Sequence, residues 1–186
     1  MHVIPLKTHG CLKIDLDRKT DARGFFIKTF QESVFRAAGF SITTAEDFYT
    51  SSIKGVIRGM HFQLPPKPLK KLVHCAAGSI LDVLLDLRAE SPTYLQVESL
   101  TLTGDAPCVL CLPVGIAHGF VALTNEALVC YKVDQEYNPA LDAGIRWDSF
   151  GFDWPVNQPA VSDRDAAFPA LQDFKTPFRF SGGQDD

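Results

Sequence analysis

The stretch Arg58-Gly59-Met60-His61-Phe62-Gln63 decides the fold, because it reads as a β-strand that carries both a cation and an imidazole. Successive side chains of a strand point to opposite faces, so alternation places Arg58 and Met60 on one face and His61 on the other. A histidine that faces the interior of a barrel is a candidate proton carrier, since its ordinary pKa of about 6.5 lies near neutral pH. Structural histidines are commoner, and this stretch alone favours that interpretation.

The segments on either side predict a mostly β protein. Helical signals are sparse: the clearest is at residues 31–38, which Gly39 ends, and a short turn is expected at residues 163–167. Short apolar runs broken by Gly, Pro, Asp or Asn predict strands at residues 71–76, 79–87, 96–102, 109–112 and 128–133. Many short strands at near-regular spacing are typical of a sandwich or a barrel. Asp82 and Asp86, four residues apart, predict a polar strip on one face of a covered strand.

Composition limits the class of protein. The 186 residues are 46% hydrophobic and contain no linker, so we expect one domain over residues 1–186, with residues 181–186 as a disordered tail. A net charge of −4 and the lack of a basic stripe argue against a nucleic-acid partner. The N-terminal sequence lacks a signal-peptide pattern, and no apolar run approaches the roughly 20 residues of a membrane span. These features predict a cytoplasmic protein without a membrane partner.

Two patterns raise the question of a metal. Cys108 and Cys111 form C-x-x-C within an apolar strand, where residues three apart face opposite ways and cannot grip one zinc ion. Pro113-x-Gly115-x-x-His118 resembles the second half of the cupin signature, but His61 is not followed by x-His as the first half requires. His61, His74 and His118 could still meet in space, so a metal site remains an alternative.

A longer series of motifs is more specific. In chain order it covers most of the sequence from Asp21 to Phe174 and resembles the dTDP-4-dehydrorhamnose 3,5-epimerase family, metal-free cupins that invert centres on nucleotide-linked 4-keto sugars. The motifs are Asp21-Ala-Arg-Gly-Phe-Phe26, Arg58 to Gln63, Lys71-Leu-Val73, Asp82-Val83, Asp86-Leu-Arg88-x-x-Ser-Pro-Thr93, Leu112 to Phe120, Tyr131-Lys132, Tyr137-x-Pro139, Gly144-Ile-x-Trp147 and Ser162-Asp-Arg-Asp165.

The resemblance implies a fold and a reaction. The fold would be a cupin, or jelly-roll, double-stranded β-helix barrel with a few short helices. The reaction would be inversion at C3, C5 or both of a nucleoside-diphosphate 4-keto-6-deoxy sugar, a hexose or heptose, with neither cofactor nor metal. The C4 ketone acidifies both neighbouring carbons, so the enzyme needs a base on one face, an electrophile at the C4 oxygen and a proton donor on the other face.

Resemblance maps these roles onto four residues. His61 would be the base, Asp165 the carboxylate that orients and charges it, Lys71 the cation beside the enolate oxygen and Tyr131 the opposite-face acid. Each has another interpretation from the residues alone. Asp165 could cap a short helix, Lys71 could join Lys70 in a solvated pair, and Tyr131 could be a core aromatic.

Further residues would bind the substrate. Resemblance maps Arg58 and Arg23 to the phosphates, which arginine suits because its planar fork grips oxyanions. In this family Arg23 comes from the partner of a homodimer through exchanged N-terminal strands, here residues 1–30, which also cover strand edges. The other predicted binding residues, near the sugar, the nucleotide or the rim, are Phe26, Lys28, Asp47, Gln63, His118, Tyr137 and Trp147.

Three departures from the family pattern bear on the substrate. Lys28 stands where the family usually has Glu, Phe48 stands in Glu46-Asp-Phe-Tyr-Thr50 where it often has Gln-Asp-Asn-x-Ser, and Pro68-Leu-Lys70 precedes Lys71. The first two predict a nucleotide or sugar other than the dTDP-6-deoxyhexose of rhamnose synthesis. Two alternatives stay open: a metal-dependent enzyme on the same barrel, and a non-catalytic sugar-nucleotide binding protein.

Overall fold

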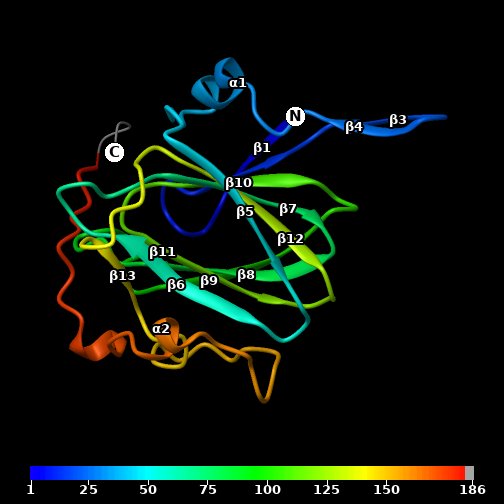
Figure 1. The fold of residues 1–186 in the computed structure, drawn as a ribbon. Coiled ribbons are helices and arrows are strands. Elements are labelled where there is room, and N and C mark those ends of the chain that lie inside the picture. Colours follow the sequence, from blue (N-terminus) through cyan, green and yellow to red (C-terminus); the bar gives the residue numbers. More distant parts are fainter. Residues whose placement is uncertain (183–186) are drawn as a thin grey trace.

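Two β-sheets face each other in the computed structural model, which describes residues 1–182 (Figure 1). The six-stranded sheet has the order β1-β2-β10-β7-β12-β5, and the five-stranded sheet has the order β13-β6-β11-β8-β9. The strands are β1 (His2–Pro5), β2 (Leu12–Asp15), β3 (Arg18–Asp21), β4 (Gly24–Ile27), β5 (Glu46–Ser52), β6 (Ile57–Gln63), β7 (Lys71–Ala77), β8 (Ser79–Asp86), β9 (Val97–Thr103), β10 (Cys108–Leu112), β11 (Ile116–Ala122), β12 (Ala127–Val133) and β13 (Asp142–Gly144).

Three short helical segments accompany the sheets, α1 (Glu32–Ala37), α2 (Asp163–Ala166) and a 3-10 turn at Leu171–Asp173. The predicted helix, the predicted turn and all five predicted strand regions are therefore confirmed, as is the mostly β architecture. Of the predicted tail, residues 183–186 lie outside the described residues. Within the part that is described, no helix is both long and apolar enough to cross a membrane.

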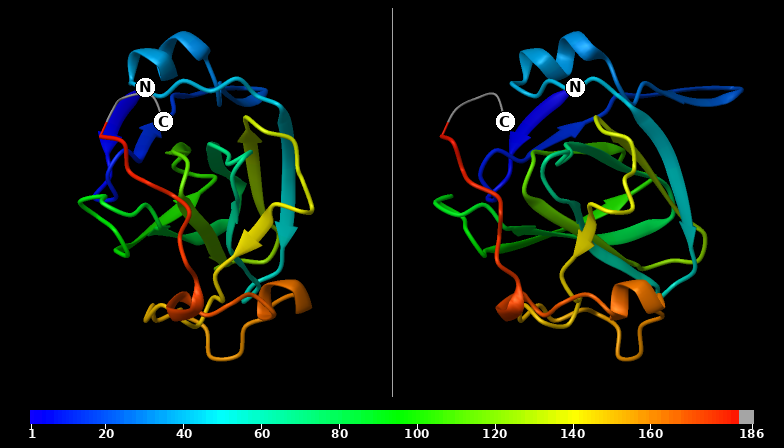
Figure 2. Two further views of the ribbon diagram at one scale, coloured as in Figure 1. Left: turned by 90° about the vertical axis from the view of Figure 1, so that its left-hand side faces the viewer. Right: turned by 60° about the vertical axis from the view of Figure 1, so that its left-hand side comes forward.

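The hydrophobic core has three parts. The first fills the space between the sheets and includes Val73, Leu84 and Phe120. The second lies on the outer face of the five-stranded sheet, where the C-terminal segment covers Met60 and Leu85 (Figure 2). The third packs α1 and the segment after it on the six-stranded sheet. Because β8 is covered on both faces, its side chains are nearly all buried, as its continuous apolar character predicted.

The cysteines follow this layering. Cys108 belongs to the core between the sheets, and Cys111 belongs to the core under α1. The two thiols therefore face opposite sides of β10, as the strand alternation predicted. All five cysteines are free.

A β-bulge in β6 places Arg58 and His61 on the same face of the strand, which differs from the prediction. In the pairing with β11, His61 stands opposite His118 and Arg58 stands opposite Phe120, so three steps on β6 match two on β11. The extra residue reverses the alternation between Arg58 and His61. Arg58 and His61 thus line one cavity, while Met60 is buried in the core on the other side. The prediction that Arg58 and Met60 share a face is wrong, because counting by two cannot detect an inserted residue.

Glycine is required at this bulge. Gly59 has a φ of +146°, and a Cβ there would lie 2.5 Å from the Cα of Gly119 on β11. Residues other than glycine rarely adopt that backbone conformation, and the neighbouring strand leaves no room for a Cβ atom. The close approach of the two backbones helps to fix the positions of two nearby histidines, His118 next to Gly119 and His61 two residues after Gly59.

The hairpin formed by β3 and β4 projects away from both sheets (Figure 1). Its tip carries Arg23, which is paired with Asp21 at 2.7 Å. Phe25 and Phe26 on β4 are 57% and 60% exposed. Two large apolar side chains exposed on one short strand are typical of an interaction surface. A two-stranded ribbon is also only marginally stable alone, so contact with another surface would stabilise it.

Candidate active site

A cavity of about 410 Å³ opens between the two sheets. Its walls come from β5, β7 and β12 of one sheet, from β6 and β11 of the other, and from the segments that carry Asp142 and Arg164. The lining residues are Glu46, Phe48, Thr50, Arg58, His61, Phe62, Gln63, Leu69, Lys71, His118, Tyr131, Val133, Gln135, Tyr137, Asp142 and Arg164. Three of the four predicted catalytic residues are among them, and the fourth, Asp165, contacts one of them directly.

His61 and Asp165 form a hydrogen-bonded pair at the edge of the cavity. Nε2 of His61 lies 2.8 Å from Oδ1 of Asp165, and the carboxylate is buried. Burial lowers the pKa of His61 below its ordinary value, and the bond to Asp165 opposes this effect without cancelling it. The imidazole is therefore mostly neutral at pH 7, with a carboxylate on one nitrogen, which is the state that a general base needs.

The local sequence places Asp165 for this role. Ser162 accepts a hydrogen bond from the Asp165 amide at 3.1 Å and caps α2, so Asp165 is not the cap. Its second oxygen accepts from the amide of Gly59 at 3.0 Å. Burial raises the pKa of this carboxyl, but the hydrogen bonds from His61 and Gly59 outweigh it and hold the pKa below the ordinary value. The bulge that positions His61 therefore also holds its partner.

Sequence reasoning missed Arg164 and Asp142, which flank this pair. Nη1 of Arg164 lies 3.3 Å from both Nε2 of His61 and Oδ1 of Asp165. The same guanidinium donates to both oxygens of Asp142, at 2.8 and 2.5 Å. Arg164 lies inside the motif Ser162 to Asp165, and Asp142 lies between Pro139 and Gly144. Both were therefore within reach of the motif pattern, but their meeting depends on how β13 and α2 pack.

Lys71 enters the cavity from β7 and donates to the carbonyl oxygen of His61 at 3.0 Å. Burial lowers its pKa from 10.5 to about 8, and the nearby carboxylates of Asp142 and Asp82 limit the fall. The ammonium form therefore still dominates at pH 7 and is lost above about pH 8. Lys71 is half-buried and is bonded to the His61 carbonyl, so it does not form a solvated pair with Lys70.

Tyr131 reaches the cavity from β12, on the sheet opposite His61. Burial raises its pKa above the ordinary value, so the phenol keeps its proton at neutral pH. Phe48 on the neighbouring strand β5 stacks on its ring, with centroids 4.9 Å apart and planes at 16°. Offset stacking fixes the ring plane, and the phenylalanine covers one face of the phenol.

Three predicted binding residues line the same cavity near its wall and rim. Arg58 donates to the hydroxyl of Ser52 at 3.0 Å, which ties its guanidinium to β5. The side-chain amide of Gln63 bonds to backbone groups. It donates to the carbonyl of Lys67 at 2.6 Å and accepts from the backbone amide of Asn138 at 3.0 Å. Tyr137 is 59% exposed at the rim.

His118 also lines the cavity, and it is buried. Its Nε2 lies 2.7 Å from Oδ2 of Asp82, which is fully enclosed on β8. The predicted polar strip of β8 is thus two separate carboxylates. Asp82 binds His118, while Asp86 binds Arg88 and two hydroxyls.

Five predicted binding residues do not line the cavity of their own chain. Asp47 pairs with Lys132 on the outer face of β5, because alternation turns Glu46, Phe48 and Thr50 inward. Trp147 accepts a hydrogen bond at its carbonyl from the indole of Trp154, outside the cavity. The remaining three lie on or next to the projecting hairpin: Arg23, Phe26 and Lys28.

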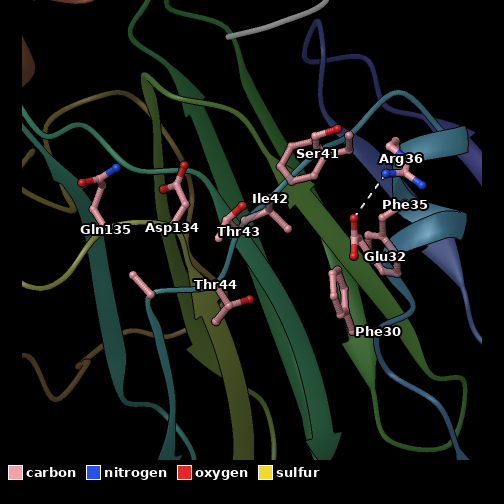
Figure 3. A pocket seen from close by; sticks show the side chains of 12 residues that line it. Phe30, Glu32, Phe35, Arg36, Ser41, Ile42, Thr43, Thr44, Asp134 and Gln135 are labelled. Carbon is pink, nitrogen blue, oxygen red and sulfur yellow. Dashed lines mark hydrogen bonds and ion pairs between the residues drawn. The ribbon is translucent and has the colours of Figure 1, made fainter.

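A second cavity, of about 570 Å³, lies between α1 and the segment that leads into β5 (Figure 3). Its charged groups are already engaged. Glu32 pairs with Arg36, and Asp134 accepts from the amide of Lys70 at 2.7 Å. The cavity therefore offers no set of groups for proton transfer among the residues that line it.

The three histidines of the metal alternative do not converge. His61 and His118 face the cavity between the sheets, whereas His74 on β7 is not among its lining residues. Across residues 1–182, no group of three His, Cys, Asp or Glu side chains is arranged to hold a metal ion.

Comparison with known proteins identifies the family of this chain. The sequence model of the family described as dTDP-4-dehydrorhamnose 3,5-epimerase matches residues 5–173. An enzyme of that name from Methanothermobacter thermautotrophicus is 38% identical over 169 residues, which cover 88% of this chain and 91% of the relative. A dTDP-4-dehydrorhamnose 3-epimerase from Streptomyces niveus is 34% identical over 168 residues, covering 89% of this chain and 81% of the relative.

A solved structure shows the same fold. The dTDP-6-deoxy-D-glucose-3,5-epimerase of Legionella pneumophila, in complex with dTDP-4-keto-L-rhamnose, superimposes with a TM-score of 0.91 at 31% identity. The alignment covers 96% of this chain and 98% of that one. The protein is accordingly an isomerase built on a cupin barrel. It belongs to the dTDP-4-dehydrorhamnose 3,5-epimerase family, which confirms the resemblance read from the motifs.

Proposed function

We propose that the protein epimerises a dTDP-4-keto-6-deoxy sugar at C3 and C5 through an enolate. The observation that carries the proposal is the placement of His61 and Tyr131 on opposite sheets of one cavity, with Asp165 bonded to the histidine at 2.8 Å. A sugar ring between the sheets would present one face to a base and the other to an acid. Inversion of a carbon centre requires this opposition.

Each residue has a defined part in the proposed mechanism. His61 removes the proton from the carbon next to the C4 ketone, and the electron pair moves onto the C4 oxygen. The Lys71 ammonium stabilises that oxygen, and Asp165 stabilises the imidazolium that forms. The Tyr131 hydroxyl then donates its proton to the carbon from the opposite face. Solvent restores the proton on Tyr131, and the imidazolium returns its proton to solvent.

The choice of nucleotide rests on the relatives, whose names specify dTDP sugars. This proposal differs from the expectation of another nucleotide or sugar, which was based on the departures at Lys28 and Phe48. Phe48 stacks on Tyr131, so its position in the cavity is beside the proposed acid. Its aromatic ring there would affect the fit of the sugar ring and the access of water to the phenol.

The test is turnover of a matched panel in deuterated solvent. We expect dTDP-4-keto-6-deoxyglucose to react with kcat/KM at least about 10-fold above its CDP and GDP analogues, with deuterium at both C3 and C5. NMR at the two carbons reads the positions separately. Label at C3 alone would reduce the proposal to a 3-epimerase, a preference for CDP or GDP would restore the other nucleotide, and label at neither carbon would end the epimerase assignment.

We also propose that the hairpin of β3 and β4 completes the cavity of a partner subunit in a homodimer. Arg23, Phe26 and Lys28 lie outside their own cavity, while Phe25 and Phe26 leave apolar surface uncovered. β5 is the edge strand of the six-stranded sheet and borders the cavity, so it offers free backbone groups to a neighbouring chain. Arg23 would add a cation for the diphosphate beside Arg58.

Complementation tests this exchange. Arg23→Ala lacks the hairpin cation, and His61→Asn lacks the base, so each variant alone should be nearly inactive. After mixing under conditions that exchange subunits, half the dimers are mixed, and each holds one intact cavity, giving about a quarter of wild-type activity. Arg179→Ala, an exposed arginine paired with Glu90, is the matched control and should need no partner. Mixed subunits without recovered activity would show that the hairpin does not act across the dimer.

A further inference from the structure

The five-stranded sheet holds a second histidine–carboxylate pair beside the first. His118 on β11 stands directly opposite His61 on β6 in the strand register, and both side chains line the cavity. Nε2 of His118 lies 2.7 Å from Oδ2 of Asp82, and Nε2 of His61 lies 2.8 Å from Oδ1 of Asp165. Two imidazoles thus enter the cavity from adjacent strands, each bonded through the same nitrogen to a carboxylate.

The two carboxylates have different surroundings. Asp165 also accepts from Gly59 and Arg164, which satisfy its oxygens. Asp82 is 0% exposed, and its Oδ1 has no hydrogen-bond partner among the described residues. Burial raises the pKa of Asp82, against the opposing effects of His118 and Lys71. Keeping a buried carboxylate with a single partner costs several kcal/mol, so packing alone would favour an apolar residue on β8.

Asp86 on the same strand shows what a structural carboxylate looks like here. Its two oxygens accept from Arg88 in a bidentate pair and from the hydroxyls of Ser91 and Thr93. All of these partners are local in sequence, and none of them lines the cavity between the sheets. Asp82 has no such set, and its single partner is a histidine that does line the cavity.

The bond to Asp82 determines which nitrogen of His118 is free. With the carboxylate ionised, the shared proton belongs to Nε2, because a carboxylate can only accept. Nδ1 then remains, and no described residue forms a hydrogen bond with it. The ring also meets Tyr131 edge-on, with centroids 6.0 Å apart at 74°, so packing prevents it from turning freely.

We propose that Asp82 is a positioning residue, which holds His118 with Nε2–H toward the carboxylate so that Nδ1 contacts an oxygen of the sugar beside the reacting carbons. The inference rests on the proposed epimerase function. His118 would then orient the sugar ring between His61 and Tyr131. Loss of the carboxylate would free the ring to change tautomer or rotate, and the sugar would be held less accurately during proton transfer.

A double-mutant cycle tests this role with dTDP-4-keto-6-deoxyglucose as the probe. We expect Asp82→Asn to lower kcat about 10- to 100-fold, as loss of an orienting partner does elsewhere, with KM changed by no more than about 3-fold. The double variant with His118→Ala should be no slower than His118→Ala alone, because Asp82 acts through that ring. Additive losses, or an unchanged kcat in Asp82→Asn, would overturn the proposal. Glu90→Gln, an exposed carboxylate on the loop after β8, is the control.

A measurement on the unmodified protein covers the case in which Asp82→Asn fails to fold. In protein labelled with 15N at histidine, the His118 ring should show a protonated Nε2 at neutral pH, assigned by its loss in His118→Ala. A proton found on Nδ1 instead would refute the inference. This readout does not need turnover. If wild-type protein processes no sugar nucleotide yet shows the Nε2 proton, the proposed function fails and the pairing stands.

Discussion

His61→Asn should abolish hydrogen exchange and epimerisation together, with a fall in kcat of about 10³-fold, within the range that removal of a general base produces. Asparagine approximates the size of imidazole but cannot accept a proton from carbon. Asp165→Asn should cost less, about 10²-fold, because the imidazole remains but loses the carboxylate that bonds to its Nε2. The measurement is deuterium incorporation into dTDP-4-keto-6-deoxyglucose under single-turnover conditions.

The control for this result is His74→Asn. His74 lies on β7, in the same sheet as Tyr131, but it does not line the cavity. Its replacement should therefore leave hydrogen exchange unchanged. Unfolding midpoints of the three variants separate loss of chemistry from loss of structure. Near-normal exchange in folded His61→Asn would mean that another group is the base, and His118 would be the first candidate because it lies opposite His61 in the register.

Tyr131→Phe should separate the two halves of the reaction. Removing one hydroxyl keeps the ring that stacks on Phe48 and the contact with His118, so the cavity wall stays in place. His61 can still remove and return a proton from its own face, and deuterium should therefore continue to enter the unreacted substrate. Formation of the inverted product should fall about 10²-fold, because the opposite face has lost its acid.

The separation is the diagnostic result. Wash-in of label and product formation are measured in one NMR time course, with Tyr94→Phe, a half-exposed tyrosine on the loop after β8, as the control. If label wash-in stops as completely as inversion does, Tyr131 takes part in the first proton transfer. If inversion continues at the wild-type rate, a different group or a water molecule is the acid.

Much of this architecture was accessible from the sequence. The short apolar runs predicted the strands because each run contributes side chains to the hydrophobic core, and the glycine, proline, aspartate and asparagine breaks predicted the turns between them. The pairing of His61 with Asp165, more than 100 residues apart, came only from the family resemblance, because no local pattern links a strand to a distant helix. The bulge at Gly59 was not predicted, because strand alternation assumes that no residue is inserted. The bulge places Arg58 on the same face as His61.

Other features depend on tertiary approach and have weaker signals. Glu46, Phe48 and Thr50 line the cavity together, and their spacing of two was visible in the sequence, whereas motif matching favoured the outward-facing Asp47. The contact of Arg164 with Asp142 requires β13 to bring the aspartate beside α2. Periodicity describes one strand at a time and cannot show which strands will become neighbours.

The place of β5 at the edge of its sheet has a consequence for how this enzyme can change. The proposed proton-transfer groups sit on inner strands, β6, β7 and β12, and on α2, where any shift disturbs neighbours on both sides. Phe48 sits on the edge strand, and Lys28 follows the projecting hairpin; both are departures from the family pattern. A substitution at Phe48 alters a wall of the cavity, and one at Lys28 alters the segment that we propose completes a partner's cavity, both at little risk to the barrel. Variation in substrate can therefore accumulate at the margin while the reaction itself is inherited intact.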